Sequence, residues 1–160
     1  RTPVDGKVNI GYFGTFYPNR GMGDVLTALA SLDASVRDRL AVRLHTPANP
    51  ELSRAIVEHG LSQVVTRHDE LPYLSMLATL RGFDCLLVTD ADTETGTHRR
   101  AVNPYLPSKV SDYVGAGVPI WAIVEPASIL SRLATHYQDR RGDIAGIAAS
   151  LTQLAEGGPR

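Results

Sequence analysis

The sequence FDCLLVTD, residues 83–90, and the later sequence VPIWAIVE, residues 118–125, are almost continuously apolar. A strand with one face in water alternates apolar and polar residues, whereas an unbroken apolar strand is typical of a parallel sheet that is buried on both faces. These two segments therefore predict the central strands of a parallel sheet with helices on both sides.

Segments of strand length and segments of helix length alternate along the rest of the chain. Further strands are expected at 7–14, 40–46, 62–67 and near 136–139, and helices at 23–32, 49–60, 70–82 and 143–156. Asn49 followed by Pro50 is a signal for the start of a helix, and Gly60 is a signal for its end. The alternation predicts an α/β fold, a doubly wound and mostly parallel Rossmann-like sheet of about six strands with helices on both faces.

Composition limits the number of domains and the kinds of partner. A chain of 160 residues with 43% hydrophobic content predicts a single domain over residues 1–160 that supports its own core. The net charge of -1 argues against non-specific binding of nucleic acid, although a local cluster could still hold a phosphate-bearing small molecule. Since the sequence has neither a secretory signal nor an apolar run of roughly 18 residues, we expect a cytoplasmic chain with no direct membrane span.

Few side chains in the sequence are candidates for covalent or metal chemistry. Cys85, the only cysteine, lies in an apolar strand and is expected to be a buried, inert thiol. The histidines are dispersed, and the acidic run at 90–95 is interpreted as a solvated loop, so no metal and no cofactor are expected. His98 and the arginines at 99–100 follow that run in the longest irregular segment, where they are candidates for contacts with a sugar or a phosphate.

The loop that follows the first expected strand is the first place to look for a ligand. Doubly wound sheets bind ligands beyond the carboxyl ends of their strands, where the strand order reverses. The loop sequence GYFGTFYPNRGMG, residues 11–23, matches neither the dinucleotide fingerprint nor the phosphate-binding loop. It does place Arg20 and Gly21 near the start of a helix, where backbone amides and a guanidinium can hold an anion. The alternative is that Arg20 is solvated and the glycines serve a turn, and this loop alone favours the alternative.

A second segment, LPSKVSDYVGAGVPIW at residues 106–121, carries a more specific signal. Ser108 is expected to cap a helix after Pro107, so that Lys109 lies in the first turn, where the helix dipole disfavours a cation. Asp112, one turn later, falls on the same face as Lys109. Val110, Tyr113 and Val114 are expected to pack on the sheet, and the glycines at 115 and 117 to end the helix in a left-handed conformation.

This arrangement of charges suits a nucleoside diphosphate. Free amides and the ammonium group of Lys109 would take phosphate oxygens, and Asp112 would accept hydrogen bonds from ribose hydroxyls. The alternative is a local ion pair between the two side chains, which contributes only about 0.3–0.5 kcal/mol on an exposed helix. An ion pair would not account for a lysine at the very start of the helix.

The two segments together resemble a known family. YFGTFYPNRGMGDVLTALASL, residues 12–32, looks like the opening of the carboxy-terminal, donor-binding domain of GT-B glycosyltransferases, in the retaining group 1 family that uses nucleotide sugars. LPSKVSDYVGAGVPIW is similar to the donor motif of that domain. The resemblance extends over essentially the whole chain, and the second segment is the more specific of the two.

The resemblance implies roles for individual residues. Arg20 and Lys109 would hold the diphosphate and act in catalysis, Asp112 would hold the ribose, and the backbone of the loop around Thr66 and Arg67 would receive the base. Further donor-binding positions implied by the two motifs are Gly14, Thr15, Leu106, Pro107 and Ser108.

The sequence also departs from the family pattern at two positions. The family often has an arginine where this chain has Thr15, and a glutamate where it has Pro104. The second departure affects the contact that would face the sugar. It also weakens the alternative of a sugar-nucleotide epimerase of GT-B architecture, which would favour a carboxylate pair near the sugar.

The resemblance implies an enzyme that transfers the sugar of a UDP-sugar or similar donor to a polysaccharide, glycolipid or small-molecule acceptor. The acceptor would bind to a missing amino-terminal domain, so these 160 residues are expected to bind nucleotide but to transfer no sugar. That domain, or a lipid-linked acceptor, could hold the enzyme at the membrane periphery. A non-catalytic, flavodoxin-like binding module is the alternative without chemistry, and it would bind none of the common nucleoside diphosphates.

Overall fold

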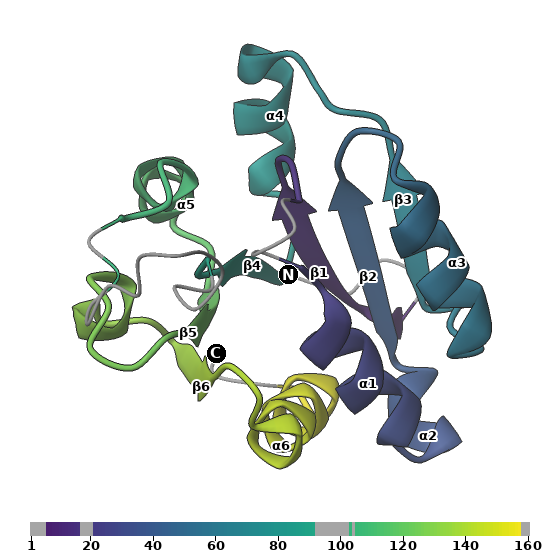
Figure 1. Ribbon diagram of the computed structural model, residues 1–160. Coiled ribbons are helices and arrows are strands. Elements are labelled where there is room, and N and C mark those ends of the chain that lie inside the picture. Colours follow the sequence, from purple (N-terminus) through teal and green to yellow (C-terminus); the bar gives the residue numbers. More distant parts are fainter. Residues whose placement is uncertain (1–5, 17–20, 92–102, 104, 158–160) are drawn as a thin grey trace.

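The computed structural model of the protein describes residues 6–16, 21–91, 103 and 105–157. Its centre is a six-stranded sheet in the order β3-β2-β1-β4-β5-β6, in which all neighbouring strands are parallel. The strands are β1 (Val8–Phe13), β2 (Leu40–His45), β3 (Val65–His68), β4 (Cys85–Thr89), β5 (Ile120–Val124) and β6 (Tyr137–Arg140). The predicted doubly wound α/β fold is confirmed, and the strand order reverses between β1 and β4 (Figure 1).

Helices cover both faces of the sheet. They are α1 (Gly23–Ser31), α2 (Ala34–Arg37), α3 (Pro50–Glu58), α4 (Tyr73–Leu80), α5 (Lys109–Ala116), α6 (Ile144–Ala155) and the 3-10 helix η2 (Leu130–Arg132). The short helix α2 was not expected from the sequence. The strand β3 begins later than predicted, because the backbone amides of Val64 and Val65 both donate to the carbonyl of Leu61 and form a turn there.

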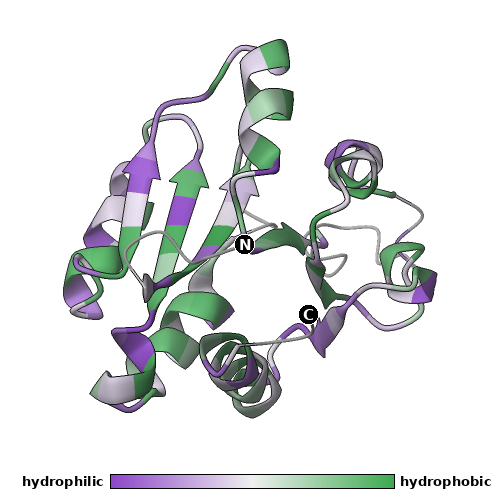
Figure 2. Ribbon diagram, turned by 180° about the vertical axis from the view of Figure 1, so that it is seen from behind, coloured by the Kyte–Doolittle hydropathy of each residue, from purple (hydrophilic) through white to green (hydrophobic). Residues whose placement is uncertain are grey.

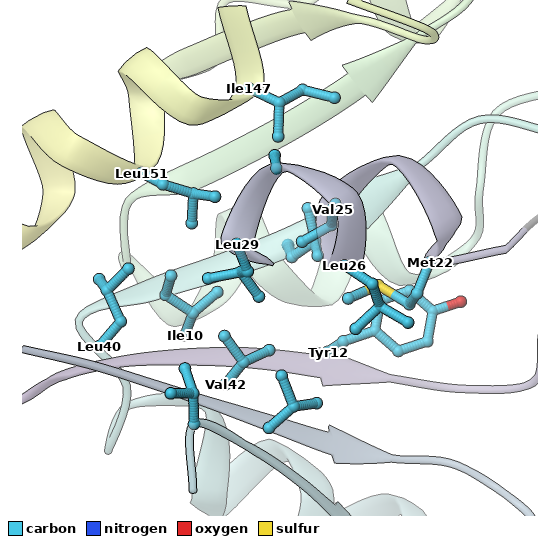
Figure 3. Close-up of a cluster of buried hydrophobic side chains, with 14 of the residues drawn as sticks. Ile10, Tyr12, Met22, Val25, Leu26, Leu29, Leu40, Val42, Ile147 and Leu151 are labelled. Atoms are coloured by element: carbon cyan, nitrogen blue, oxygen red, sulfur yellow. The ribbon is translucent and has the colours of Figure 1, made fainter. Parts of the chain in front are cut away.

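Two hydrophobic cores hold the layers together. The larger core lies between the sheet and the helices α1, α3 and α6, and Figure 3 shows side chains of α1 packed between β1, β2 and α6. The smaller core lies between the sheet and α4 and α5. Every residue of β4 and β5 is buried, as their sequences predicted, whereas β6 is an edge strand with more hydrophilic residues (Figure 2).

The buried position of Cys85 agrees with the sequence prediction of an inert thiol. Its side chain lies in the larger core, and burial raises the pKa of the thiol to about 12. A thiolate is therefore scarce at neutral pH. In the described part of the chain, no helix combines the length and the apolar character that a membrane span requires.

Two predicted helix starts have different outcomes. The side chain of Asn49 accepts a hydrogen bond of 2.9 Å from the backbone amide of Leu52, which confirms the predicted cap of α3. Ser108 precedes α5 but makes no side-chain cap, so that prediction was wrong. Its φ of -57° and ψ of -31° are already helical, and a capping side chain needs an extended residue to reach back to the first turn.

This difference gives a matched pair of substitutions. Asn49→Ala is expected to lower the free energy of unfolding by about 1 kcal/mol, because it leaves a first-turn amide of α3 without its acceptor. Ser108→Ala removes a hydroxyl that caps nothing and is expected to change stability very little. Equilibrium unfolding in urea measures both, and an equal loss in the two variants would contradict the assignment of caps.

Candidate functional site

The strands β1 and β4 separate at the point where the strand order reverses. They pair at only two positions, Ile10 with Cys85 and Gly11 with Leu86. Beyond these pairs, the backbone amide of Phe13 donates a hydrogen bond of 3.1 Å to the phenol oxygen of Tyr113 on α5. A side chain of α5 thus replaces a strand as the partner of β1, and it fixes α5 at the carboxyl end of β1.

The described part of α5 agrees with most of its sequence prediction. Val110 and Tyr113 are buried against the sheet, whereas Val114 is 66% exposed, so the buried stripe is narrower than expected. Gly117 ends the helix with a φ of +66°, which confirms the predicted left-handed end. Gly115 is an ordinary helical residue, so the prediction for that glycine was wrong.

Lys109 is the first residue of α5, and its side chain reaches the loop after β1. The ammonium nitrogen Nζ lies 3.8 Å from the ring centroid of Tyr12. A methyl group added at Gly14 would lie 3.0 Å from the same nitrogen. The structure therefore brings together Lys109 and Gly14, two residues that the sequence placed in separate segments.

Tyr12 forms the surface on which the ammonium group rests. Phe16 stacks on its ring with centroids 4.3 Å apart, so Phe16 and the ammonium of Lys109 must lie on opposite faces of that ring. The hydroxyl of Tyr12 donates a 3.4 Å hydrogen bond to the carbonyl of Thr15 and so connects the ring to the loop. An aromatic face attracts a cation, so this contact positions the ammonium group beside the loop after β1.

The role of Tyr12 was not foreseen from the sequence. Its position in an apolar strand predicts burial in the larger core, and Figure 3 shows the ring beside Met22 in that core. No sequence pattern indicates that a lysine almost a hundred residues later contacts the same ring. The contact lies near the carboxyl end of β1, beyond the last residues that pair β1 with β4.

Asp112 has a partner from a different helix. The hydroxyl of Tyr73, the first residue of α4, donates a hydrogen bond of 2.9 Å to Oδ1 of Asp112. This bond raises the pKa of the Tyr73 phenol. The local ion pair between Lys109 and Asp112 is therefore not the arrangement adopted, since the carboxylate is held by Tyr73 and the ammonium lies over Tyr12.

Thr66 and Arg67 lie near the carboxyl end of β3, which is separated from β1 by β2. Both belong to β3 and not to the loop after it, because β3 begins later than expected. The guanidinium of Arg67 donates to the carbonyl of Thr46 at 3.0 Å and forms an ion pair of 2.9 Å with Asp69. Its side chain thus joins the segments that follow β2 and β3.

A row of stacked rings connects the carboxyl ends of the first three strands. The rings of Phe13 and His45 are stacked with centroids 4.6 Å apart, and those of His45 and His68 with centroids 5.0 Å apart. Burial lowers the pKa of His45, and the nearby His68 and Arg43 act in the same direction. This row begins at Phe13, a residue of the smaller core, and spans the carboxyl ends of β1, β2 and β3.

The segment that leads into α5 is anchored by a buried side chain. Asn103 is 2% exposed, donates a hydrogen bond to the carbonyl of Ala91 and accepts one from the amide of Tyr105. Pro107 is buried, whereas Leu106 is 41% exposed. Asn103 was missed as a positioning residue, because an Asn-Pro pair in a loop ordinarily signals only a turn.

Charged residues connect the carboxyl ends of the last three strands. The amide of Glu125 donates to Oδ2 of the fully buried Asp90 at 2.9 Å. Arg141 donates to the backbone carbonyl of Asp90 at 3.1 Å and pairs with the Glu125 carboxylate at 2.8 Å. These contacts join the three strand ends, and no sequence pattern predicted them, since the three residues follow different strands.

Several predicted residues lie outside the described part of the chain. They are Arg20, Pro104, and the segment that contains His98, Arg99 and Arg100. Among the residues that are described, no group of three or more histidine, cysteine or carboxylate side chains has a geometry that could hold a metal ion.

Comparison with known proteins identifies the fold. No family model and no curated sequence matches the chain. Among solved structures, TarM from S. aureus, determined in a complex with UDP, superimposes with a TM-score of 0.69 at 9% identity over 95% of this chain and 29% of its own. The carboxy-terminal domain of a group 1 glycosyl transferase, LpcC from Francisella tularensis, has a TM-score of 0.65 at 15% identity over 94% of this chain and 76% of that domain.

A different enzyme class is also present among the similar structures. A putative UDP-N-acetylglucosamine 2-epimerase from Listeria monocytogenes has a TM-score of 0.58 at 12% identity, over 95% of this chain and 37% of its own. The chain thus spans well under half of TarM and of the epimerase but most of the isolated transferase domain. From its strand order and these similarities, the chain has the fold of the carboxy-terminal domain of GT-B group 1 glycosyltransferases.

Proposed function

We propose that this chain is the donor-binding part of a glycosyltransferase and that it binds a nucleoside diphosphate sugar. The observation that carries the proposal is the position of the Lys109 ammonium group, at the start of α5, beside Gly14 and at the reversal of strand order. Ligands of doubly wound sheets bind at this reversal. An anion bound there would interact favourably with both the ammonium group and the first-turn amides of α5.

Different residues around Lys109 would bind different parts of the donor. Lys109 would contact the diphosphate, and Gly14, which has no side chain, would leave room for the ammonium group of Lys109. Asp112 would accept a hydrogen bond from the ribose, one turn further along α5. Arg20 is proposed from the sequence alone as a second phosphate ligand, and the backbone near Thr66 and Arg67 as the site for the base.

The proposed catalysis is electrostatic. When the bond between the sugar carbon and the diphosphate oxygen breaks, the diphosphate leaves with the electron pair and gains negative charge. Lys109 and the first-turn amides of α5 would stabilise that charge more strongly in the transition state than in the bound donor. The acceptor hydroxyl forms the new bond and loses its proton, and we assign no described residue as its base. The base would belong to the acceptor-binding part of the whole enzyme. The acceptor that binds there would be a polysaccharide, a glycolipid or a small molecule.

Calorimetric titration of the chain with UDP, GDP and ADP tests the proposal. One of the three is expected to bind, and UMP or its equivalent is expected to bind much more weakly, because the second phosphate provides most of the contact with Lys109. If none of the three binds, the chain is a module without a donor site and the proposal is wrong.

An epimerase would use the same nucleotide-binding site, so nucleotide binding does not distinguish it from a transferase and a separate measurement is needed. Incubating the whole enzyme with a UDP-sugar and no acceptor distinguishes the two classes. An epimerase changes the configuration of the sugar in the recovered nucleotide, which NMR detects, whereas a transferase leaves that configuration unchanged.

A further inference from the structure

The hydrogen bond between Tyr73 and Asp112 joins two helices at the edge of the candidate site. The residues are distant in sequence and belong to α4 and α5, which both pack on the smaller core. Tyr73 is 59% exposed, and the adjacent Leu74 is 77% exposed. The first turn of α4 is therefore held only weakly by burial, and Leu80, at the other end of the helix, is the α4 residue that is fully buried.

A hydrogen bond between exposed groups contributes little to folding, because water competes for both partners. The bond has a larger effect on the orientation of the Asp112 carboxylate than on the stability of the fold. An aspartate on a helix surface can rotate its carboxylate among several orientations, and a phenol that donates a 2.9 Å hydrogen bond to Oδ1 favours one of them. Oδ2 and the remaining lone pair of Oδ1 are then presented in a defined direction.

We propose that Tyr73 is a positioning residue that orients Asp112 toward the ribose of the bound nucleotide and so provides selectivity for ribose over deoxyribose. This inference rests on the proposed function and extends it to the sugar of the nucleotide. A carboxylate that is oriented before binding loses less rotational freedom when it accepts a ribose hydroxyl. A 2′-deoxynucleotide lacks one of the two hydroxyls and gains less from that orientation.

Tyr73→Phe tests the proposal, because it removes the donor and keeps the ring. Affinities for a ribonucleoside diphosphate and for its 2′-deoxy analogue are measured by calorimetry for the wild type and the variant. We expect the affinity for the ribonucleotide to fall by about threefold to tenfold and that for the deoxynucleotide to change less. Leu74→Ala, a change at the next exposed position of α4, is the control and is expected to leave both affinities unchanged.

A double-mutant comparison separates positioning from packing. If Tyr73 acts through Asp112, Tyr73→Phe has no further effect on ribonucleotide affinity in the Asp112→Ala background. An equal loss for the two nucleotides, or an unchanged effect of Tyr73→Phe in the Asp112→Ala background, would show that Tyr73 acts on the fold of α4 and would overturn the proposal.

Failure of this inference can be distinguished from failure of the proposed function. If the wild type binds ribonucleotide and Tyr73→Phe does not alter selectivity, only the role of Tyr73 is wrong. If the wild type binds neither nucleotide, the donor site itself is wrong, and the inference falls with it. The bond can also be followed without nucleotide, since it raises the pKa of Tyr73 and Asp112→Asn should lower that pKa in an NMR titration of the phenol.

Discussion

Lys109→Ala is expected to weaken binding of the preferred nucleoside diphosphate by about 1.5–3 kcal/mol, or roughly 10-fold to 150-fold in dissociation constant. The reason is the loss of a charged hydrogen bond at a position where the aromatic face of Tyr12 already holds the ammonium group. A lysine that is oriented before the ligand arrives loses less side-chain entropy on binding than a lysine that moves freely in solvent. Calorimetry at fixed salt concentration measures the change.

The other lysine of the chain is a matched control for this experiment. Lys7 lies just before β1, at the amino end of the strand, whereas Lys109 lies near its carboxyl end. Lys7→Ala removes the same charge and is expected to leave nucleotide affinity unchanged. Lys109→Met keeps most of the packing on Tyr12 and should lose affinity as Lys109→Ala does. Similar losses of affinity for Lys7→Ala and Lys109→Ala would mean that the net charge of the protein, and not a phosphate-binding site at the start of α5, governs nucleotide binding.

The fold was predictable because its signals are local and repeated. The unbroken apolar sequences of β4 and β5 predicted burial on both faces, and every residue of both strands is buried. Asn49 and Gly117 marked the start of α3 and the end of α5 through rules that depend only on neighbouring residues. Ser108 failed as a cap because its own backbone angles are already helical, which the local sequence does not reveal.

The candidate site was predictable only in part, because its contacts cross between elements. The position of Lys109 at the start of a helix follows from its local sequence. The partners Tyr12 and Tyr73 could not be predicted from local sequence, since Tyr12 lies on β1 and Tyr73 on α4, whereas the residues they contact lie on α5. Tyr113 was expected to pack on the sheet, and it does, but its bond to the Phe13 amide depends on where β1 and β4 separate.

Gly14→Ala is expected to have two separate effects, one on stability and one on binding. The φ of Gly14 is +116°, a conformation that residues with a side chain rarely adopt, so the substitution should cost about 1–3 kcal/mol of folding free energy. The amide of Gly14 donates to the carbonyl of His45 at 2.9 Å, which resists relaxation of the strained backbone. Urea unfolding measures this cost. Gly115→Ala is the control, because Gly115 has no positive φ and no atom within 4 Å of an added methyl group. That substitution, inside α5, should raise stability by about 0.5–1 kcal/mol.

The effect of Gly14→Ala on binding comes from the Lys109 ammonium group. The added methyl would lie 3.0 Å from Nζ, and the flexible end of the lysine can move away at little cost in stability. The movement displaces the ammonium group from Tyr12, so nucleotide affinity should fall although Lys109 is still present. In the Lys109→Ala background, Gly14→Ala should therefore keep its cost in stability but cause no further loss of affinity. A further loss of affinity in that background would show that Gly14 contacts the nucleotide independently of the lysine. The phosphate-binding site would then have to be assigned to the loop after β1.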